Sequence, residues 1–189
     1  MSTLVISSGI WFGYEFTTFL IRNRFEYLVR ISIGACFGIA FQSFIFFISS
    51  SFYQLTKIHA IIVSLFFFLM AYFFAYLNRK FYPSKVIRYP KLDLFILLVC
   101  GLFICAGVYN ANMQNGFYTR GPAFADLPFH LNIISSFSQG INYKRKSLFD
   151  VWSCFQADIM LAYPMFHNLY IAVLINCNDI KYFIYYFVV

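Results

Sequence analysis

The chain has 189 residues, of which 61% are hydrophobic and only 11% charged, and its net charge is +7. A soluble domain usually carries about a quarter charged residues, so this chain has too little polar surface to face water all round. The positive charge does not indicate nucleic-acid binding, because most basic residues stand in short clusters between apolar runs, where membrane orientation signals belong. The composition therefore excludes a water-soluble fold and predicts an all-α, polytopic transmembrane bundle.

Apolar runs give the expected helices in chain order. A helix needs about 20 apolar residues to cross the hydrocarbon, because its backbone groups must bond internally. Three runs are free of charge, and two weaker runs contain either Glu15 or both Pro164 and His167. We therefore expect a bundle of four to five spans, at residues 4–21, 31–56, 60–77, 94–108 and 159–175. We place a loose boundary near residue 90. Residues 1–90 then hold three spans, and residues 91–189 hold one span, an extracytoplasmic loop and an incomplete last span.

Basic residues between the runs predict the orientation of the bundle. Positive charge favours the cytoplasmic side of a membrane. One cluster follows the first run and a second follows the third, while the loop between them holds only Lys57. The clusters are Arg22, Arg24 and Arg30, and Arg79, Lys80, Lys85, Arg88 and Lys91. The N-terminus and residues 111–158 then face the lumen or the extracellular space, of the endoplasmic reticulum or the plasma membrane.

The segment from Asp126 to Gly140 predicts a short helix on that outer side. Asp126 suits an N-cap, Pro128 is tolerated in a first turn and Gly140 supplies a stop. Apolar residues recur on one face at helical spacing: Leu127, Leu131, Ile134 and Phe137, widened by Phe129 and Ile133. A helix of about 13 residues is too short to span, so we expect it to lie in the membrane interface.

Metal and disulfide chemistry have no signature in the chain. The histidines are far apart, and most cysteines lie in or near apolar runs, where they are expected to be buried free thiols. No phosphate-binding glycine loop or nucleophile elbow is present. We therefore expect no metal and no cofactor.

Residues 121–140, GPAFADLPFHLNIISSFSQG, follow a span and carry an acidic residue just before a short helix. This arrangement resembles the first extracytoplasmic loop of the GT-C superfamily, multi-pass glycosyltransferases that use polyprenyl-phosphate sugars. Residues 162–175, AYPMFHNLYIAVLI, are similar to the Tyr-Pro segment that leads into the next span of such enzymes. The resemblance covers about residues 92–175. It implies transfer of a sugar from a lipid phosphate to a hydroxyl acceptor.

Asp126 is the residue on which this chemistry would depend. A carboxylate within hydrogen-bond reach can take the proton of the acceptor hydroxyl as the glycosidic bond forms. Asp126 is the only acidic residue between Asp93 and Asp150. His130, one helical turn on, is expected to orient the carboxylate or bind substrate. Basic side chains that could neutralise a lipid phosphate are Arg120, Lys144, Arg145 and Lys146.

Simpler interpretations stay open. One alternative is that Asp126 only caps its helix, and another is that the basic run only contacts solvent or anionic lipid. GT-C members have many more spans, so we expect a truncated or partial copy that is inactive alone and needs a protein partner in the membrane. The alternative function is a non-catalytic accessory or scaffold subunit. A transporter is ranked last, because few charged residues lie within the spans to line a pathway, and Glu15 is the main one.

Overall fold

The computed structural model describes residues 1–21, 27–81, 95, 99–104, 106, 113–114, 118–119, 126–140, 142–143, 145, 151 and 166–178. The chain divides into two compact units, which are described separately. One unit comprises Met1–Pro83 with Pro128–Val189, and the other comprises Ser84–Leu127. The first unit contains the long helices.

Three helices of the first unit are long and apolar enough to cross a membrane: α1 (Ser2–Ile21), α2 (Tyr27–Ser49) and α3 (Lys57–Phe81). At a rise of about 1.5 Å per residue, each can traverse a hydrocarbon layer of about 30 Å. These helices confirm the first three expected runs. In the part of the chain that the structure describes, they are the helices of an integral membrane protein. Their bounds differ from the prediction because α2 ends at Ser49, where three consecutive serines begin.

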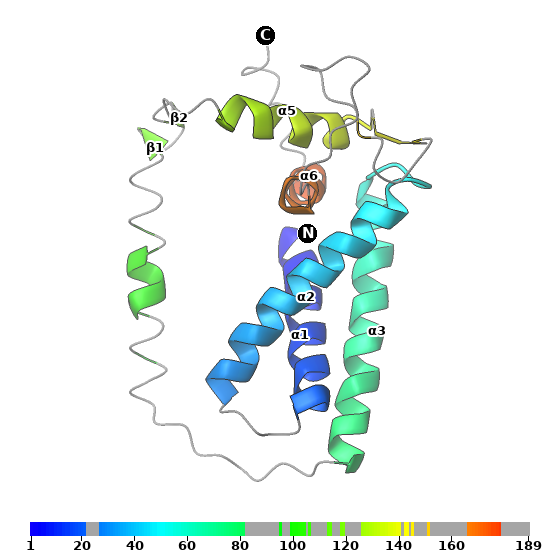
Figure 1. The fold of residues 1–189 in the computed structure, drawn as a ribbon, viewed down its shortest axis with the longest axis vertical. Coiled ribbons are helices and arrows are strands. Elements are labelled where there is room, and N and C mark those ends of the chain that lie inside the picture. The colour runs from blue at the N-terminus through cyan, green and yellow to red at the C-terminus, as the bar shows by residue number, and fades with distance from the viewer. Residues whose placement is uncertain are drawn as a thin grey trace. The chain divides into compact units, whose positions relative to one another are not determined.

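Glycines bring α1 and α2 into direct backbone contact. Gly9 and Gly13 on α1 are four residues apart, as are Gly34 and Gly38 on α2. A Cβ at Gly13 would lie 2.7 Å from the Gly38 nitrogen and 2.8 Å from the Gly34 carbonyl carbon, so no side chain fits there. Small residues at this spacing let two membrane helices approach closely. Figure 1 shows α2 crossing α1 obliquely at this contact.

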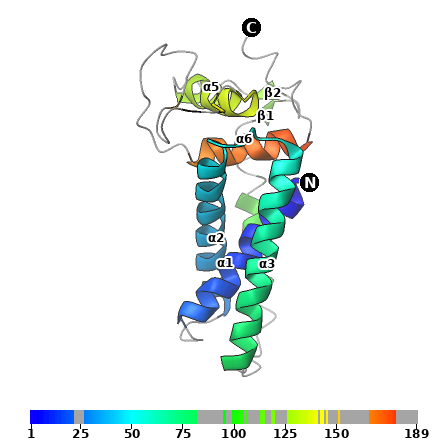
Figure 2. The same cartoon turned by 90° about the vertical axis from the view of Figure 1, so that its right-hand side faces the viewer.

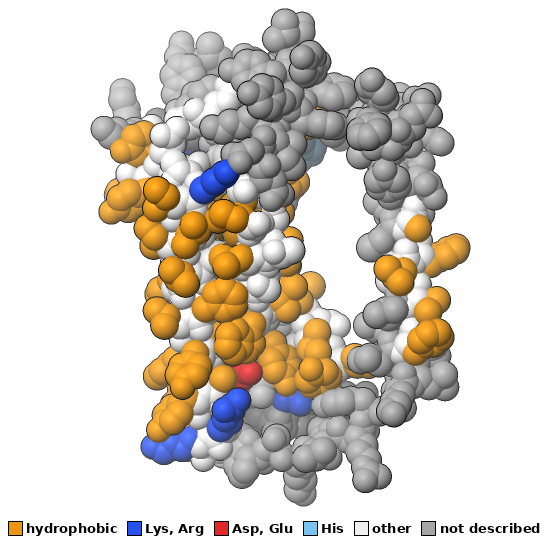
Figure 3. All heavy atoms as spheres, turned by 180° about the vertical axis from the view of Figure 1, so that it is seen from behind, with side chains coloured by type: hydrophobic (Ala, Val, Ile, Leu, Met, Phe, Trp, Pro, Cys, Tyr) orange, Lys and Arg blue, Asp and Glu red, His pale blue; other side chains and the backbone are white. Residues whose placement is uncertain are grey.

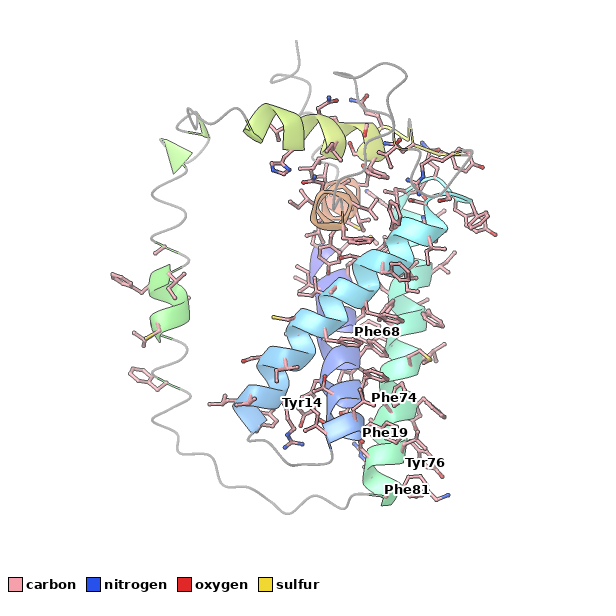
Figure 4. All side chains as sticks on the ribbon, viewed as in Figure 1. Tyr14, Phe19, Phe68, Phe74, Tyr76 and Phe81 are labelled. Carbon is pink, nitrogen blue, oxygen red and sulfur yellow. The ribbon has the colours of Figure 1, made fainter. Side chains whose placement is uncertain are left out.

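Aromatic rings fill the contact between α1 and α3. Phe12 meets Phe67 edge-on with ring centroids 5.0 Å apart, and Phe16 meets Phe74 in the same way at 5.0 Å. Figure 4 shows Phe19 and Phe74 between the two helices, where their centroids lie 5.4 Å apart. Edge-to-face pairs of this kind add about 0.5–1.5 kcal/mol each beyond the area they bury. α1 is therefore held through glycines on one side and rings on the other.

The outer face of α3 is exposed and apolar. Its exposed large side chains are Ile58, Ile62, Leu65, Phe66, Leu69, Tyr72, Phe73 and Tyr76. Figure 3 shows hydrophobic side chains covering this side of the molecule, with Lys and Arg side chains at its lower end and also near its upper end. Such a face suits contact with lipid tails, which resemble apolar side chains as a solvent. Basic residues in the last turn of α3 are Arg79 and Lys80.

Two shorter helices complete the first unit: α5 (Asp126–Ser138) and α6 (Phe166–Asn178). Figure 2 shows α6 lying crosswise over the ends of α2 and α3. Its buried residues Leu169, Ala172 and Val173 belong to the same hydrophobic core as Phe46 and Phe67 of the long helices. α6 has 13 residues, fewer than a membrane span needs, and the earlier part of the expected run at 159–175 lies outside the described residues. The fifth span stays a prediction.

The second unit holds the region of the expected fourth span. Residues 95, 99–104 and 106 are helical, and the rest of the run at 94–108 lies outside the described residues. β1 (Met113–Gln114) pairs antiparallel with β2 (Tyr118–Thr119), Met113 opposite Thr119. The polar stretch predicted to be a loop thus contains a small hairpin. The expected domain boundary near residue 90 also lies among residues that are not described.

Candidate functional site

The expected helix after residue 125 is present, with both of its ends where the sequence predicts them. α5 begins at Asp126, places Pro128 in its first turn and ends at Ser138. Gly140 then adopts a φ of 78°, a left-handed conformation that glycine accepts without strain. The side chains of residues 126–129 lie outside the described part of the chain, and His130, one turn along, is half-buried.

Burial along α5 differs from the one-sided pattern that the sequence predicts. Ile133, Ile134 and Phe137 are buried as expected, but Asn132, Ser135 and Ser136 between them are buried as well. Six consecutive residues point to all sides of a helix, so this stretch is covered all round and has no bare polar face. The location of α5 in the membrane interface therefore stays a prediction.

Arg145 joins the segment after α5 to the C-terminal end of α2. Its Nη2 donates to the Phe47 carbonyl at 2.9 Å, to Ser50 Oγ at 3.1 Å and to Ser51 Oγ at 2.6 Å. The guanidinium also lies over the rings of Phe47 and Phe137, 4.8 and 5.4 Å from their centroids. A cation at this position satisfies a helix-end carbonyl and opposes the helix dipole.

Asn176 of α6 connects three parts of the first unit. Its Nδ2 donates to the Leu55 carbonyl at 2.7 Å and to the Ser138 carbonyl, the last residue of α5, at 3.2 Å. Gly140 adjoins Gln54 of the same α2–α3 turn, where an added Cβ would lie 3.1 Å from the Gln54 Cδ. The end of α5 and the end of α6 are therefore fastened to residues 50–56, the turn between α2 and α3.

A buried polar chain links α1, α2 and α6. Gln42 is fully buried, its Nε2 donates to Ser8 Oγ at 2.9 Å, and its Oε1 accepts from the Tyr170 hydroxyl at 3.0 Å. Burial raises the pKa of Tyr170 to about 12, so its phenol stays protonated and able to donate. Each of these groups would lose free energy if buried without a partner, so the chain fixes how α6 sits on α1 and α2.

Glu15, the charge expected within a span, is paired with α3. Asn78 Nδ2 donates to the Glu15 carboxylate at 2.8 Å and to its backbone carbonyl at 2.9 Å. Asn78 directly precedes Arg79 and Lys80 in the last turn of α3. A carboxylate within a span is costly unless paired, and this contact supplies a partner near the basic end of α3.

A serine and a histidine meet at the α2–α3 turn. Ser49, the last residue of α2, lies with its Oγ 2.8 Å from Nε2 of His59 in the first turn of α3. The His59 Nδ1 lies 3.2 Å from the Gln54 carbonyl oxygen. Ten residues and a turn separate the two members of this pair, so no local sequence pattern marks them.

The sequence-predicted site is described only in part. Arg120, Lys144 and Lys146 lie outside the described residues, while Arg145 is bonded to α2 and His130 lies on α5. Over the described ranges, no three His, Cys, Asp or Glu side chains group as metal ligands would. The described cysteines Cys36, Cys100 and Cys177 are free thiols. Cys177 is buried as expected, but the expectation of burial is wrong for Cys36 and Cys100, which are exposed on their helices. The glycine contact between α1 and α2 was missed, although the four-residue glycine spacing in both helices is a readable signal.

Helix lengths and packing thus define the class of protein, a helical bundle with three helices fit to cross a membrane. Comparison with protein-family models, with curated proteins and with solved structures finds no match for the chain. Function is therefore argued from the residues and their geometry.

Proposed function

We propose that the chain is a multi-pass membrane protein that binds a polyprenyl-phosphate sugar at the start of α5, in the manner of a GT-C glycosyltransferase. The observation that supports this most is the position of α5. Its far end is fastened through Arg145 and Asn176 to the α2–α3 turn, the end of the bundle opposite Arg79 and Lys80. Among the described residues, the end to which this helix is attached carries Lys57 and Arg145, and the other end carries Arg30, Arg79 and Lys80.

Charge distribution supports an extracytoplasmic position for this helix. Arg30 lies near the start of α2, and Arg79 and Lys80 lie at the end of α3, so these three residues mark one end of the bundle. Positive residues favour the cytoplasmic side, which supports a lumenal or extracellular position for α5 and α6. Sugar transfer from a lipid phosphate in this proposal takes place there, at the water–lipid boundary.

The chemical roles follow from the residue types. Asp126 accepts the proton of the acceptor hydroxyl while the oxygen attacks the anomeric carbon and the lipid phosphate leaves. His130 orients the carboxylate or contacts the sugar. Because Arg145 already donates to three oxygens of the α2 end, we assign it to anchoring and leave phosphate binding to Arg120, Lys144 and Lys146.

Two substitutions at Asp126 separate proton transfer from helix capping. Asn caps a helix about as well as Asp, whereas Ala costs about 1 kcal/mol at an N-cap. We expect Asp126→Asn to preserve thermal stability and abolish sugar transfer in native membranes that retain the protein partner the chain is expected to need, and Asp126→Ala to reduce both. Asp150→Asn, which removes another carboxylate of the same segment, is the matched control and should transfer sugar as the wild type does.

Radiolabelled polyprenyl-phosphate mannose and polyprenyl-phosphate glucose are the probes for this assay. Unchanged turnover by Asp126→Asn would end the role of Asp126 as a base. If the wild-type chain neither retains nor turns over either lipid, the proposal fails for this chain as a whole.

A non-catalytic accessory subunit is the second candidate. It is favoured by the buried polar chain of Ser8, Gln42 and Tyr170, whose side chains bond to one another and so serve packing. This alternative predicts a stable complex with another membrane protein and no retention of lipid-linked sugar. Native mass spectrometry of the chain purified from its membrane distinguishes the two, because a monomer carrying a polyprenyl lipid contradicts the accessory role.

A further inference from the structure

The serine and histidine at the α2–α3 turn have the geometry of a nucleophile and its base. The Gln54 carbonyl can only accept, so the His59 Nδ1 at 3.2 Å must carry the proton. In the neutral ring Nε2 is then an acceptor, 2.8 Å from the Ser49 hydroxyl. The Phe46 carbonyl, 3.2 Å from the same hydroxyl, competes for its one hydrogen at the longer distance. A nucleophile within hydrogen-bond reach of a base, with the base oriented by a third group, is the arrangement that activates a serine.

Neighbouring groups hold the imidazole in this orientation. The Phe46 and Tyr53 rings lie edge-on to it, with centroids 5.8 and 6.1 Å away. Thr56 caps α3 by accepting from the backbone nitrogen of His59 at 3.2 Å, which fixes the backbone that carries the ring. His59 is 7% exposed, so the packing around it restricts rotation of its ring.

The serine, in contrast, is partly open to its surroundings and lies in a setting that suits a lipid. Ser49 is half-buried, and the adjoining turn exposes Phe52 and Tyr53 by about two thirds, at 66% and 67%. Exposed aromatic residues at the end of a membrane helix are typical of the headgroup region. The Arg145 guanidinium bonds Ser50 and Ser51, so the segment that follows Ser49 is held in place by a cation.

We propose that Ser49 is a nucleophile toward acyl esters of lipids at the membrane surface, with His59 as its general base. The Ser49 Oγ bonds to the ester carbonyl carbon as its proton moves to His59 Nε2. The bond to the alcohol then breaks, and Nε2 returns the proton to the departing oxygen. Water next attacks the acyl-serine and gives its proton to Nε2, the Oγ–carbon bond breaks, and Oγ recovers the proton. The sum is hydrolysis of one ester, without oxidant or metal.

A fluorophosphonate probe tests this activity independently of sugar transfer, because it phosphonylates an activated serine and no lipid-linked sugar is involved. We expect the wild-type chain in nanodiscs to be labelled and mass spectrometry of its peptides to place the adduct on Ser49. Ser49→Ala should abolish labelling. His59→Gln, which can still accept a hydrogen bond from Ser49 but is a far weaker base, should slow labelling at least about 100-fold.

Ser32→Ala is the matched control. Ser32 also lies on α2 and donates to a backbone carbonyl, that of Leu28 at 2.9 Å. The Ser32→Ala variant should be labelled on Ser49 as the wild type is. Absence of labelling in the wild-type chain, under conditions that label a known serine hydrolase in the same nanodiscs, overturns the proposal. Labelling on another residue, or at the wild-type rate in His59→Gln, overturns it equally and leaves the pair a structural contact.

Discussion

Individual polar side chains decide how the helices of this bundle pair. Gln42 hydrogen-bonds to residues of α1 and α6, and Asn78 hydrogen-bonds to Glu15. Asn176 hydrogen-bonds to the turn before α3 and to the end of α5. In an apolar surrounding, a polar group without a partner costs about 1–3 kcal/mol. A helix shifted by one residue would leave these groups unpaired, so they specify register where apolar contacts alone would not.

Tyr170 gives a pH-dependent prediction at this scale. Its pKa is about 12 in the folded chain and about 10 for an ordinary phenol, because burial disfavours the phenolate. The contribution of this group to stability is complete below pH 10 and is lost as the pH rises toward 12. A difference of this size corresponds to about 2 to 3 kcal/mol. The unfolding temperature of the wild type should therefore decrease between pH 10 and pH 12 and drop below that of Tyr170→Phe, because this loss exceeds the one hydrogen bond that the substitution removes.

Comparison of two phenylalanine variants isolates this effect from the other tyrosines. At pH 7, Tyr170→Phe should be less stable than wild type by about 1 kcal/mol, because Gln42 loses a hydrogen bond. Tyr72→Phe, at a position 68% exposed, should follow the wild type at every pH. A constant difference in unfolding temperature between the wild type and Tyr170→Phe from pH 7 to 12 would contradict a raised pKa of Tyr170.

At the scale of elements, α1 is the helix that the other two pack against. One side of it meets the α2 backbone through Gly9 and Gly13, and another meets α3 through Phe12 and Phe16. Without a hydrophobic force between helices in lipid, such close packing supplies much of the attraction. The glycine contact is therefore the element contact most sensitive to added volume.

Gly13→Ala tests this contact. The added methyl group would overlap the Gly34 backbone and lie 2.7 Å from the Gly38 nitrogen, so the helices must separate. We expect a loss of roughly 1–3 kcal/mol, seen as a lower unfolding temperature in detergent. Gly101→Ala, where an added Cβ has no atom within 4 Å, should be neutral or slightly stabilising. Equal behaviour of the two variants would show that α1 and α2 do not meet through glycines.

The sequence predicted the elements better than their contacts. Residues 4–21 and 60–77 lie within α1 and α3, because a long apolar run signals a helix locally. The second run was expected to continue to residue 56, but α2 ends at Ser49 and a turn leads to the Thr56 cap. Cap and turn signals around three serines are weak, since serine suits both helix ends and turns.

For the molecule as a whole, orientation in the membrane is the property to measure. Gln139 and Lys80 are both exposed, one just after α5 and the other at the basic end of α3. We expect a cysteine at position 139 to react with an impermeant maleimide that is added outside intact cells. If the protein resides in an internal membrane, this cysteine should react when the reagent is admitted to the lumen. A cysteine at Lys80 should react only when the cytoplasmic side is accessible. The reverse pattern would remove the basis for sugar transfer at Asp126.

The candidate site was predictable only where its signals are local. Asp126, Pro128 and Gly140 define the ends of α5 through capping and backbone preferences of neighbouring residues. Arg145, by contrast, bonds the Phe47 carbonyl 98 positions away, and Tyr170 bonds Gln42 across 128 positions. Such partners depend on the tertiary arrangement, which single-residue patterns do not contain. Arg145 was consequently expected to bind phosphate, and its contact with α2 was not foreseen.

The pairing of Glu15 with Asn78 has a consequence for biosynthesis. α1 is the least apolar of the three long helices, and its carboxylate meets an amide that lies 63 positions later in the chain. When α1 leaves the ribosome, this partner has not yet been made, so the helix enters the bilayer with an uncompensated polar group. Stable insertion of the first helix must therefore wait until α3 has been synthesised, and a nascent chain arrested before Asn78 should lose α1 from the membrane.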